Sequence, residues 1–180
     1  MRLMIASDIH GSALYCEKML DAYKREQADR LLLLGDLLYH GPRNDLPDGY
    51  APKKVIALLN AVRDELLCVR GNCEAEVDQM VLDFPVLADY CLLSVDGIDV
   101  FATHGHHHSF DSLPPMKRGG VFVQGHTHIP KCLERDGILC LNPGSVSIPK
   151  EGSEHSYMIY ENRRFEWKSL DGRVYMEHSL

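Results

Sequence analysis

Five short apolar segments of this 180-residue sequence each end in one or two side chains that can bind a metal ion. The segments are LMIAS, LLLLG, LLCVRG, DVFAT and VFVQG, and the donors that follow them are Asp8 with His10, Asp36, Asn72, His104, and His126 with His128. Carboxylates, an amide carbonyl and imidazoles together suit borderline transition metals. Each motif alone is weak, because Gly-Asp and Gly-Asn also occur in ordinary turns, but the ordered set indicates a metal centre.

The spacing of these donors predicts a pair of divalent cations. Asp8 and His10 are two residues apart, and so are His126 and His128, so on extended backbone both members of each pair would point to the same side. Asp36 can bridge two cations and offset their repulsion. Two metals roughly 3.5–4 Å apart can generate a hydroxide nucleophile and clamp the phosphoryl oxygens in an in-line displacement. The predicted chemistry is therefore hydrolysis of a phosphate ester.

Alternating strand and helix signals predict how the donors of the first half are brought together. Buried strands are expected at 2–6, 29–34 and 66–69, and helices at 12–27, 52–65 and near 75–82, the last carrying Val77, Met80 and Val81. Ser12 is the expected N-cap of the first helix, and Pro52 suits the first turn of the second. In open α/β sheets ligands bind at the carboxyl edge of the strands, and the donors should meet there.

The second half of the chain has mainly strand signals. Asp-Gly dipeptides, which favour tight hairpin turns, occur at 96–97, 136–137 and 171–172 within the β-rich segments 90–104, 131–145 and 155–178. Strand–helix units followed by hairpins predict an α/β fold with two packed sheets. At this length one domain over residues 1–180 is the simplest organisation.

Composition excludes several classes of function. The chain has 19 Lys and Arg against 26 Asp and Glu, a formal net charge of -7, which argues against non-specific binding to nucleic acid or anionic lipid. No apolar run approaches the roughly 20 residues needed to span a bilayer, and the N-terminus lacks the pattern of a signal peptide. The six cysteines have no paired short spacing, so we expect free thiols in a reducing compartment, the cytoplasm.

Motifs along most of the chain resemble the calcineurin-like metallophosphoesterase superfamily, and within it the small bacterial YfcE-type phosphodiesterases. They are SDIHG, LLLLGDLLYHGPRN, VRGNCE, THGH, GHTHIP and NPGSVSIP, and the resemblance covers about residues 1–162. It implies a four-layer α/β sandwich in which two mixed β-sheets pack face to face with helices outside. It also implies a homo-oligomer, either a dimer or a tetramer.

The resemblance further implies which residues hold each metal. One ion would be held by Asp8, His10, Asp36 and His128, and the second by Asp36, Asn72, His104 and His126, with Asp36 bridging. Manganese is the metal we expect first, and zinc, iron and nickel are the alternatives.

Four residues are candidates for a direct part in catalysis: Asp36, Asn72, Cys73 and His106. Cys73 occupies a position where many superfamily members have a histidine that contacts the phosphate, and a thiol is the poorer proton donor. We favour a role for Cys73 as a small filler beside the metals over a role as nucleophile. His106 is two residues from His104 and would contact either the phosphate or the residues behind the metals.

The loop 37–51 offers further candidates, each as readily explained as a solvated loop residue. His40 is an alternative proton donor, and Arg43 or Asn44 can contact the second ester arm of a substrate. The leading hypothesis is a dinuclear phosphodiesterase that acts on small phosphate diesters through metal-activated hydroxide. The alternatives are a protein-binding scaffold like the retromer subunit that shares the fold, or a phosphomonoesterase or nuclease of the same superfamily. Seven intact donor positions favour the enzyme, and the acidic charge disfavours the nuclease.

Overall fold

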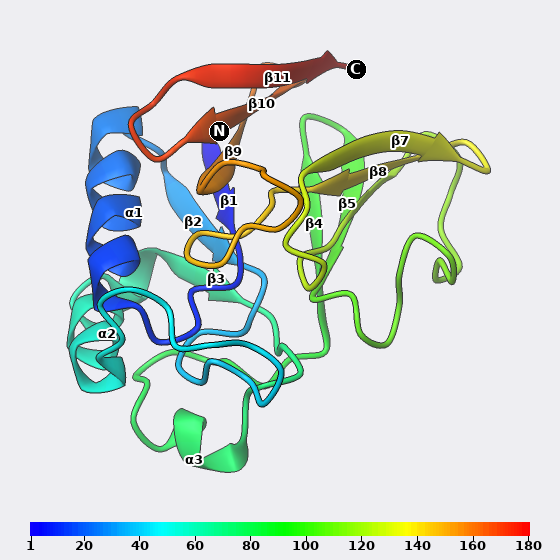
Figure 1. The fold of residues 1–180 in the computed structure, drawn as a ribbon. Helices are drawn as coiled ribbons and strands as arrows, with labels where there is room; N and C mark the ends of the chain where they lie inside the picture. The colour runs from blue at the N-terminus through cyan, green and yellow to red at the C-terminus, as the bar shows by residue number, and fades with distance from the viewer.

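The computed structural model describes residues 1–180 and contains two β-sheets packed face to face (Figure 1). The first sheet has six strands in the order β11-β10-β9-β1-β2-β3. Their bounds are β1 Leu3–Ala6, β2 Arg30–Leu33, β3 Leu66–Cys68, β9 Ser156–Glu161, β10 Arg164–Ser169 and β11 Val174–Ser179. Strands β1 to β3 are parallel, whereas β9 to β11 are antiparallel. Every residue of β1 is buried, which accounts for its uninterrupted apolar sequence.

The second sheet has five strands in the order β4-β5-β6-β8-β7. Their bounds are β4 Tyr90–Val95, β5 Ile98–Thr103, β6 Val121–Val123, β7 Lys131–Arg135 and β8 Ile138–Asn142. Two of the three turns predicted at Asp-Gly dipeptides lie in this sheet and are confirmed: Asp96 and Asp136 have φ values of 51° and 54°, and the glycine after each also has a positive φ. These values are typical of the tight turn that joins antiparallel strands. The third, at Asp171-Gly172, joins the antiparallel pair β10 and β11 of the six-stranded sheet.

Three α-helices connect the strands of the first half. Helix α1 spans Ala13–Glu26, and the Ser12 hydroxyl accepts a hydrogen bond from the amide of Tyr15 as the predicted N-cap. Helix α2 spans only Pro52–Asn60 rather than 52–65, and a 3-10 turn at Arg63–Glu65 follows it. It ends early because the Asn60 side chain binds the backbone of 81–83, where the chain passes close by.

The short helix near 75–82 is smaller than predicted. Helix α3 covers only Glu76–Gln79, and the apolar side chains of Val77, Met80 and Val81 are exposed rather than packed. The apolar residues of this segment that do enter the core come after the helix, at Leu82, Phe84 and Val86. Each of these three alternates with an exposed residue, a period of two that a helical reading of the segment misses.

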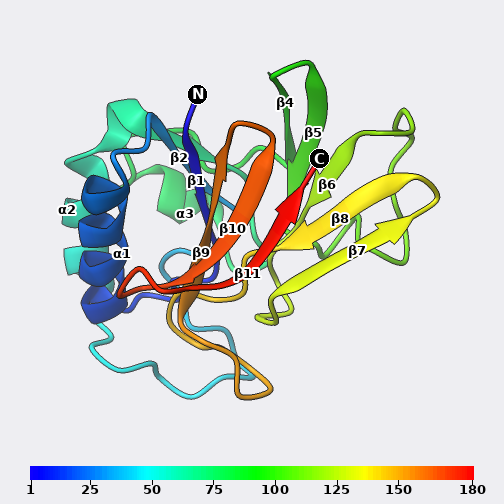
Figure 2. The ribbon, with the colours of Figure 1, turned by 90° about the horizontal axis from the view of Figure 1, so that it is seen from above.

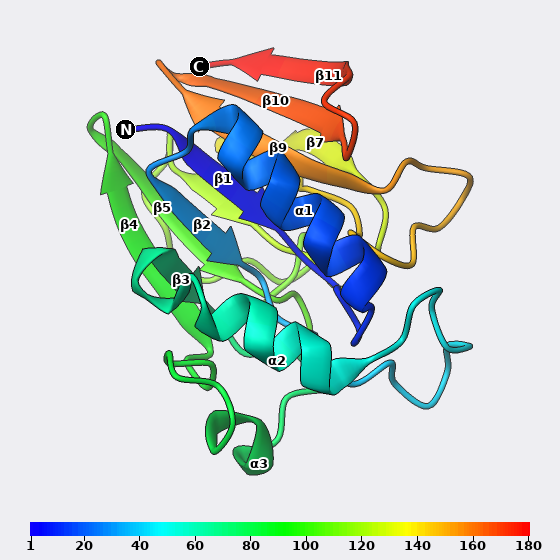
Figure 3. The ribbon, with the colours of Figure 1, turned by 90° about the vertical axis from the view of Figure 1, so that its left-hand side faces the viewer.

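The layers of the molecule are two sheets with helices on one outer face. Helices α1 and α2 lie against the six-stranded sheet, which is visible in both Figure 2 and Figure 3. The inter-sheet core includes Leu3 and Ile5 from β1, Val121 from β6, and Trp167 from β10. The expected outer helices are absent from the second sheet, where Phe122 packs instead against apolar side chains of the loop 105–119. No helix in the structure has both the length and the apolarity that crossing a bilayer requires.

Candidate metal centre

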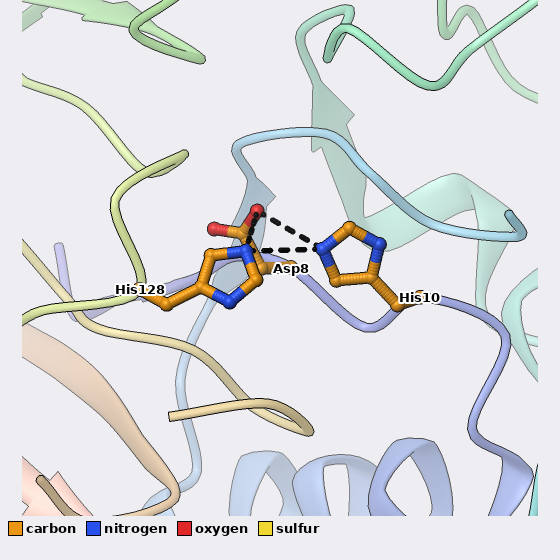
Figure 4. A group of neighbouring side chains, drawn as sticks. All are labelled: Asp8, His10 and His128. Atoms are coloured by element: carbon orange, nitrogen blue, oxygen red, sulfur yellow. Dashed lines mark hydrogen bonds and ion pairs between the residues drawn. The ribbon is translucent and has the colours of Figure 1, made fainter. Parts of the chain in front are cut away.

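Asp8, His10 and His128 form the first cluster of donors, at the ends of β1 and β6 (Figure 4). The Nε2 atom of His128 lies 3.1 Å from Nε2 of His10 and 3.2 Å from Oδ1 of Asp8. The Nε2 atom of His10 lies 3.5 Å from the same carboxylate oxygen. All three side chains are almost completely buried, so the three ligand atoms face one small volume.

His104 is the centre of a second cluster at the ends of β3, β5 and β6. Its Nε2 atom lies 3.0 Å from Oδ1 of Asn72 and 3.1 Å from Nδ1 of His126. Asp36 joins the two clusters, because its Oδ2 atom is 3.5 Å from Nε2 of His104 and 3.7 Å from Nε2 of His10. The structure thus brings all seven predicted donors together, with one carboxylate between two groups.

The backbone at the donors differs from the sequence-based expectation. Asp8 and His10 were expected on extended backbone, as were His126 and His128, but these four residues and Asp36 have φ values between 48° and 66°. This left-handed conformation is rare outside glycine and is found where surrounding structure enforces it, often at functional sites. Here the enforcement includes hydrogen bonds from the amides of Asp8 and His10 to the carbonyls of Gly35 and Asp36.

Glycines beside the donors allow the strand-end loops to touch. A Cβ atom on Gly35 would collide with the backbone of Gly71, and one on Gly125 would collide with the Ser7 hydroxyl. Gly35 also has a φ of +90°, which side chains rarely tolerate. The glycines of the Gly-Asp, Gly-Asn and Gly-His pairs are therefore required by close packing of neighbouring loops.

Three of the histidines are held in one tautomer by backbone carbonyls. The Nδ1 atoms of His10, His104 and His128 lie 2.8, 2.7 and 2.7 Å from the carbonyl oxygens of Tyr39, Leu34 and Ile148. A carbonyl can only accept, so Nδ1 carries the proton and Nε2 presents its lone pair to the cluster. His126 is the exception, since it faces His104 through Nδ1.

This donor set fits divalent cations. The Nε2 atoms of His10 and His128 are 3.1 Å apart with lone pairs directed at one another, an arrangement that is repulsive unless a positive charge lies beside them. Oδ1 of Asp8 is buried and accepts no hydrogen bond, although buried carboxylates normally have partners. A cation near these atoms would offset the repulsion between the two lone pairs and would give Oδ1 of Asp8 a partner.

Neighbouring charges and burial shift the pKa values of the donors. Burial alone would raise the pKa of Asp8, but the neighbouring rings of His10 and His128 hold it well below its usual range. Burial alone would lower the pKa of His10, but the adjacent negative charge of Asp8 raises it. The pKa of His126 is lowered by burial and by His104. Asp8 is therefore a carboxylate at neutral pH, as a metal ligand must be.

Glu74 fixes the loops that carry Asp36 and Asn72. Its buried carboxylate accepts hydrogen bonds from the amides of Asp36, Leu37 and Gly71 at 2.8, 2.7 and 2.5 Å. Burial and the charge of Asp36 raise its pKa to about 7. Sequence reasoning noted Glu74 only as part of a motif, and its place two residues after Asn72 was the available signal.

The segment 142–147 supports the loops that carry the donors through side-chain hydrogen bonds. The Asn142 amide donates to the carbonyl of Gly125 at 2.7 Å, which orders the loop before His126. The hydroxyls of Ser145 and Ser147 donate to the carbonyl of Asp8 at 2.9 and 3.0 Å. These bonds hold the strained backbone of Asp8 in place.

A cleft of about 370 Å³ opens over the two clusters. It is lined by His10, Asp36, His126 and His128 together with Arg43, Asn44, Cys73 and Lys150. Lys150 was not among the sequence candidates, because nothing in the sequence connects it with the donors. The structure connects them through a hydrogen bond of 3.2 Å from the Lys150 amide to the carbonyl of His128.

Cys73 lies in this cleft as a thiol. Its amide donates to Oδ1 of Asp36 at 2.9 Å, and burial together with the Asp36 charge raises the pKa of the thiol. His106 and His40 do not line the cleft. The His106 ring lies 5.4 Å from that of His104, and burial and neighbouring histidines lower its pKa to about 4. His40 packs edge-on against Tyr39 and Tyr50.

Comparisons with known proteins agree with this geometry. A model of the calcineurin-like phosphoesterase superfamily domain matches residues 1–164. The chain is 48% identical to phosphodiesterase YfcE of Escherichia coli K12 over 162 residues, covering 90% of this chain and 88% of YfcE. It is 27% identical to the probable metallophosphoesterase YsnB of Bacillus subtilis over 166 residues, covering 88% and 83% of the two chains.

Solved structures give the same result for the fold. A structure of YfcE, a phosphoesterase from E. coli, superposes with a TM-score of 0.96 at 44% identity and covers 99% of both chains. Vps29 from Entamoeba histolytica, solved with Zn²⁺, superposes with a TM-score of 0.64 at 19% identity over 99% of this chain and 98% of Vps29. The second likeness concerns the fold alone.

Proposed function

Because the chain belongs to the calcineurin-like phosphoesterase superfamily and is a metallophosphoesterase, we propose that it hydrolyses small phosphate diesters at a centre for two divalent cations. The observation that carries this proposal is the pair of donor clusters that meet at Oδ2 of Asp36. The likeness to YfcE, a phosphodiesterase, supports diesters as the substrate class.

The proposed ligand sets follow the two clusters. Asp8, His10, Asp36 and His128 hold one cation, and Asp36, Asn72, His104 and His126 hold the other. We propose manganese, with zinc, iron and nickel as alternatives, since nitrogen and oxygen donors accept all four. When bound, such a pair lowers the pKa of water and withdraws charge from the phosphoryl oxygens.

The chain's own residues orient the donors and receive the substrate. Carbonyl contacts at Nδ1 keep three imidazoles turned toward the centre. Cys73 lies in the cleft with a raised thiol pKa, so it stays protonated and is a weak proton donor to a departing oxygen. His106 is unprotonated at neutral pH and acts, in this proposal, by packing against His104.

The scaffold alternative predicts a different outcome in solution. Metal binding alone does not distinguish a scaffold from an enzyme, so turnover must be measured. We propose incubating the protein with bis(p-nitrophenyl) phosphate, p-nitrophenyl phosphate and plasmid DNA, with Mn²⁺, Zn²⁺ or EDTA. Metal-dependent release of p-nitrophenol from the diester is expected. No turnover of the diester with any metal would favour the scaffold, and nicking of the plasmid would favour the nuclease.

We further propose that residues 1–180 act as one domain in the cytoplasm and assemble as a dimer or tetramer. The six cysteines are all free, which supports a reducing compartment. The assembly rests on the family resemblance and can be tested by light scattering after gel filtration.

A further inference from the structure

Two positive side chains line the cleft without an acidic partner. Arg43 lies in the loop after β2, and Lys150 lies in the loop between β8 and β9. The ion pairs of the other arginines and lysines are made elsewhere on the molecule, and neither Arg43 nor Lys150 joins one. Both side chains are exposed and therefore available to a ligand.

The loop that carries Lys150 is tied to the metal centre. The Lys150 amide donates to the carbonyl of His128 at 3.2 Å, and the Ser153 hydroxyl donates to the carbonyl of Lys150 at 2.7 Å. Ile148, two residues earlier, accepts from the His128 ring. The amide and the carbonyl of Lys150 are thus both hydrogen-bonded, and the bond from the amide holds the residue beside His128, a predicted metal ligand.

The turn that carries Arg43 is tied to the other cluster. The side-chain amide of Asn44 donates to the carbonyl of His40 at 2.8 Å and closes the turn around Arg43. A Cβ atom on Gly41 would lie 3.4 Å from Sγ of Cys73, so this turn packs directly against the residue after Asn72. Two separately anchored loops therefore bring positive charge to one cleft.

The charge balance of the cleft points to a substrate with more than one anionic group. Asp36 is the one carboxylate among the lining residues, and the proposed function assigns it to the cations. The phosphoryl group of a diester carries a single negative charge, which the cations neutralise, so Arg43 and Lys150 remain unmatched. This excess positive charge is local, because the whole chain has a formal net charge of -7.

We propose that Arg43 and Lys150 form a subsite for a second anionic group, a carboxylate or a phosphate, on the arm of the diester that is not released. The inference rests on the proposed function. A cleft of about 370 Å³ corresponds to roughly a dozen water volumes, enough for a phosphoryl group and one ring-sized arm. The favoured substrates are diesters whose retained arm ends in an anion.

A pair of nearly isosteric substrates tests the subsite. Both release p-nitrophenol, and the retained arm is 4-carboxyphenyl in one and 4-carbamoylphenyl in the other, so they differ in one negative charge. We expect the substrate with the carboxylate to have a kcat/KM about tenfold higher than the substrate with the carboxamide, mainly through a lower KM. This is the effect expected of two charge contacts that are screened by solvent. Arg43→Met and Lys150→Met should each reduce this ratio about threefold, and the double variant should bring it close to one. A 4-phosphonophenyl arm distinguishes a carboxylate from a phosphate preference.

Lys54→Met is the matched control, since Lys54 is exposed on α2 and does not line the cleft. It should keep the wild-type ratio. A wild-type ratio near one, or a high ratio retained in the double variant, would overturn the subsite. Cleavage of neither ester would refute the proposed function instead. Calorimetric titration then tests the subsite without turnover. The two product monoesters, 4-carboxyphenyl and 4-carbamoylphenyl phosphate, are titrated into the same proteins, and the ratio of their Kd values replaces the ratio of kcat/KM.

Discussion

Asp36 is the residue on which both donor clusters depend, because one of its oxygens faces His10 and His104. Asp36→Asn keeps the shape and removes the negative charge between two proposed cations. We expect the Mn²⁺ content to fall below two per chain and kcat on a p-nitrophenyl diester to fall at least about 10²-fold, since metal activation contributes several kcal/mol. Elemental analysis and turnover measure the two effects.

The control for this change is Asp83→Asn, because Asp83 is exposed and its side chain makes no ion pair or hydrogen bond. Its metal content and kcat should match the wild type. Wild-type metal content and turnover in Asp36→Asn would show that the bridging carboxylate is assigned wrongly.

In the proposed reaction, the thiol of Cys73 stands where a stronger acid would protonate the leaving group. General acid catalysis contributes typically about 10²–10⁴-fold, chiefly for basic leaving groups, and a thiol with a raised pKa supplies little of it. Activity should therefore fall steeply from aryl to alkyl diesters. Cys73→Ala should change kcat on a p-nitrophenyl diester by less than about threefold, and Cys73→His should improve the alkyl esters selectively. The measurement is kcat over a leaving-group series.

A large loss in Cys73→Ala on the p-nitrophenyl diester, with metal content intact, would assign the thiol a direct catalytic part. His106→Ala and His40→Ala belong in the same series, because either imidazole is an alternative source of the proton. Neither lines the cleft, so neither variant should flatten the leaving-group dependence.

Residue types were readable from the sequence, whereas residue conformations were not. Oxygen and nitrogen donors after apolar segments identified Asp8 and His126 without any structure. Their left-handed backbone could not be predicted, because it is enforced by contacts from distant segments, such as the Ser145 hydroxyl on the carbonyl of Asp8. Lys150 was missed for the same reason.

At the scale of elements, Glu74 joins the loops after β2 and β3. Both carboxylate oxygens accept from backbone amides, so Glu74→Gln would place an amide NH₂ opposite one of these donors. At about pH 8, above the raised pKa of Glu74, we expect a loss of about 2–4 kcal/mol in the free energy of unfolding and a lower Mn²⁺ content, because hydrogen bonds to a buried charged group are lost. Urea denaturation of the metal-free protein separates the stability effect from metal binding.

Glu76→Gln is the control, since Glu76 is exposed on α3 close to Glu74. Its unfolding free energy should stay within about 0.5 kcal/mol of the wild type. An unchanged stability in Glu74→Gln would mean that the two loops are held by other contacts.

Elements with strong periodicity were predictable, and those defined by long-range contacts were not. Helix α1 and its Ser12 cap follow from local spacing alone. Helix α2 ends early because Asn60 binds a segment about twenty residues later. The loop 105–119 replaces an expected helical layer, since an irregular segment that packs through Phe110 and Met116 has no period to detect.

At the scale of the whole molecule, the centre lies where the two sheets meet. Asp8, His10, Asp36 and Asn72 come from strand ends of the six-stranded sheet, and His104, His126 and His128 come from the five-stranded sheet. Any cation held by both groups links the two sheets. Binding to the native state alone therefore adds stability to the entire fold, in proportion to the affinity and the free concentration.

The resulting prediction is that Mn²⁺ raises the stability of the protein and that the increment shrinks as pH falls. A free concentration a hundred times Kd adds about 2.7 kcal/mol per site to the free energy of unfolding. His10 has a raised pKa, so acidification places a proton on the Nε2 atom that would bind the cation, while the Asp8–His10 pair itself becomes stronger. The difference between Mn²⁺ and EDTA should thus be largest near about pH 8 and much smaller near about pH 6. Urea titrations at both pH values measure it. His128→Asn should abolish about half of the increment, because His128 is a proposed ligand of one of the two cations, whereas His178→Asn on β11, away from the cleft, should preserve all of it. An increment that is equal at the two pH values would contradict metal binding through His10, and an undiminished increment in His128→Asn would contradict a metal site that His128 shares with the six-stranded sheet.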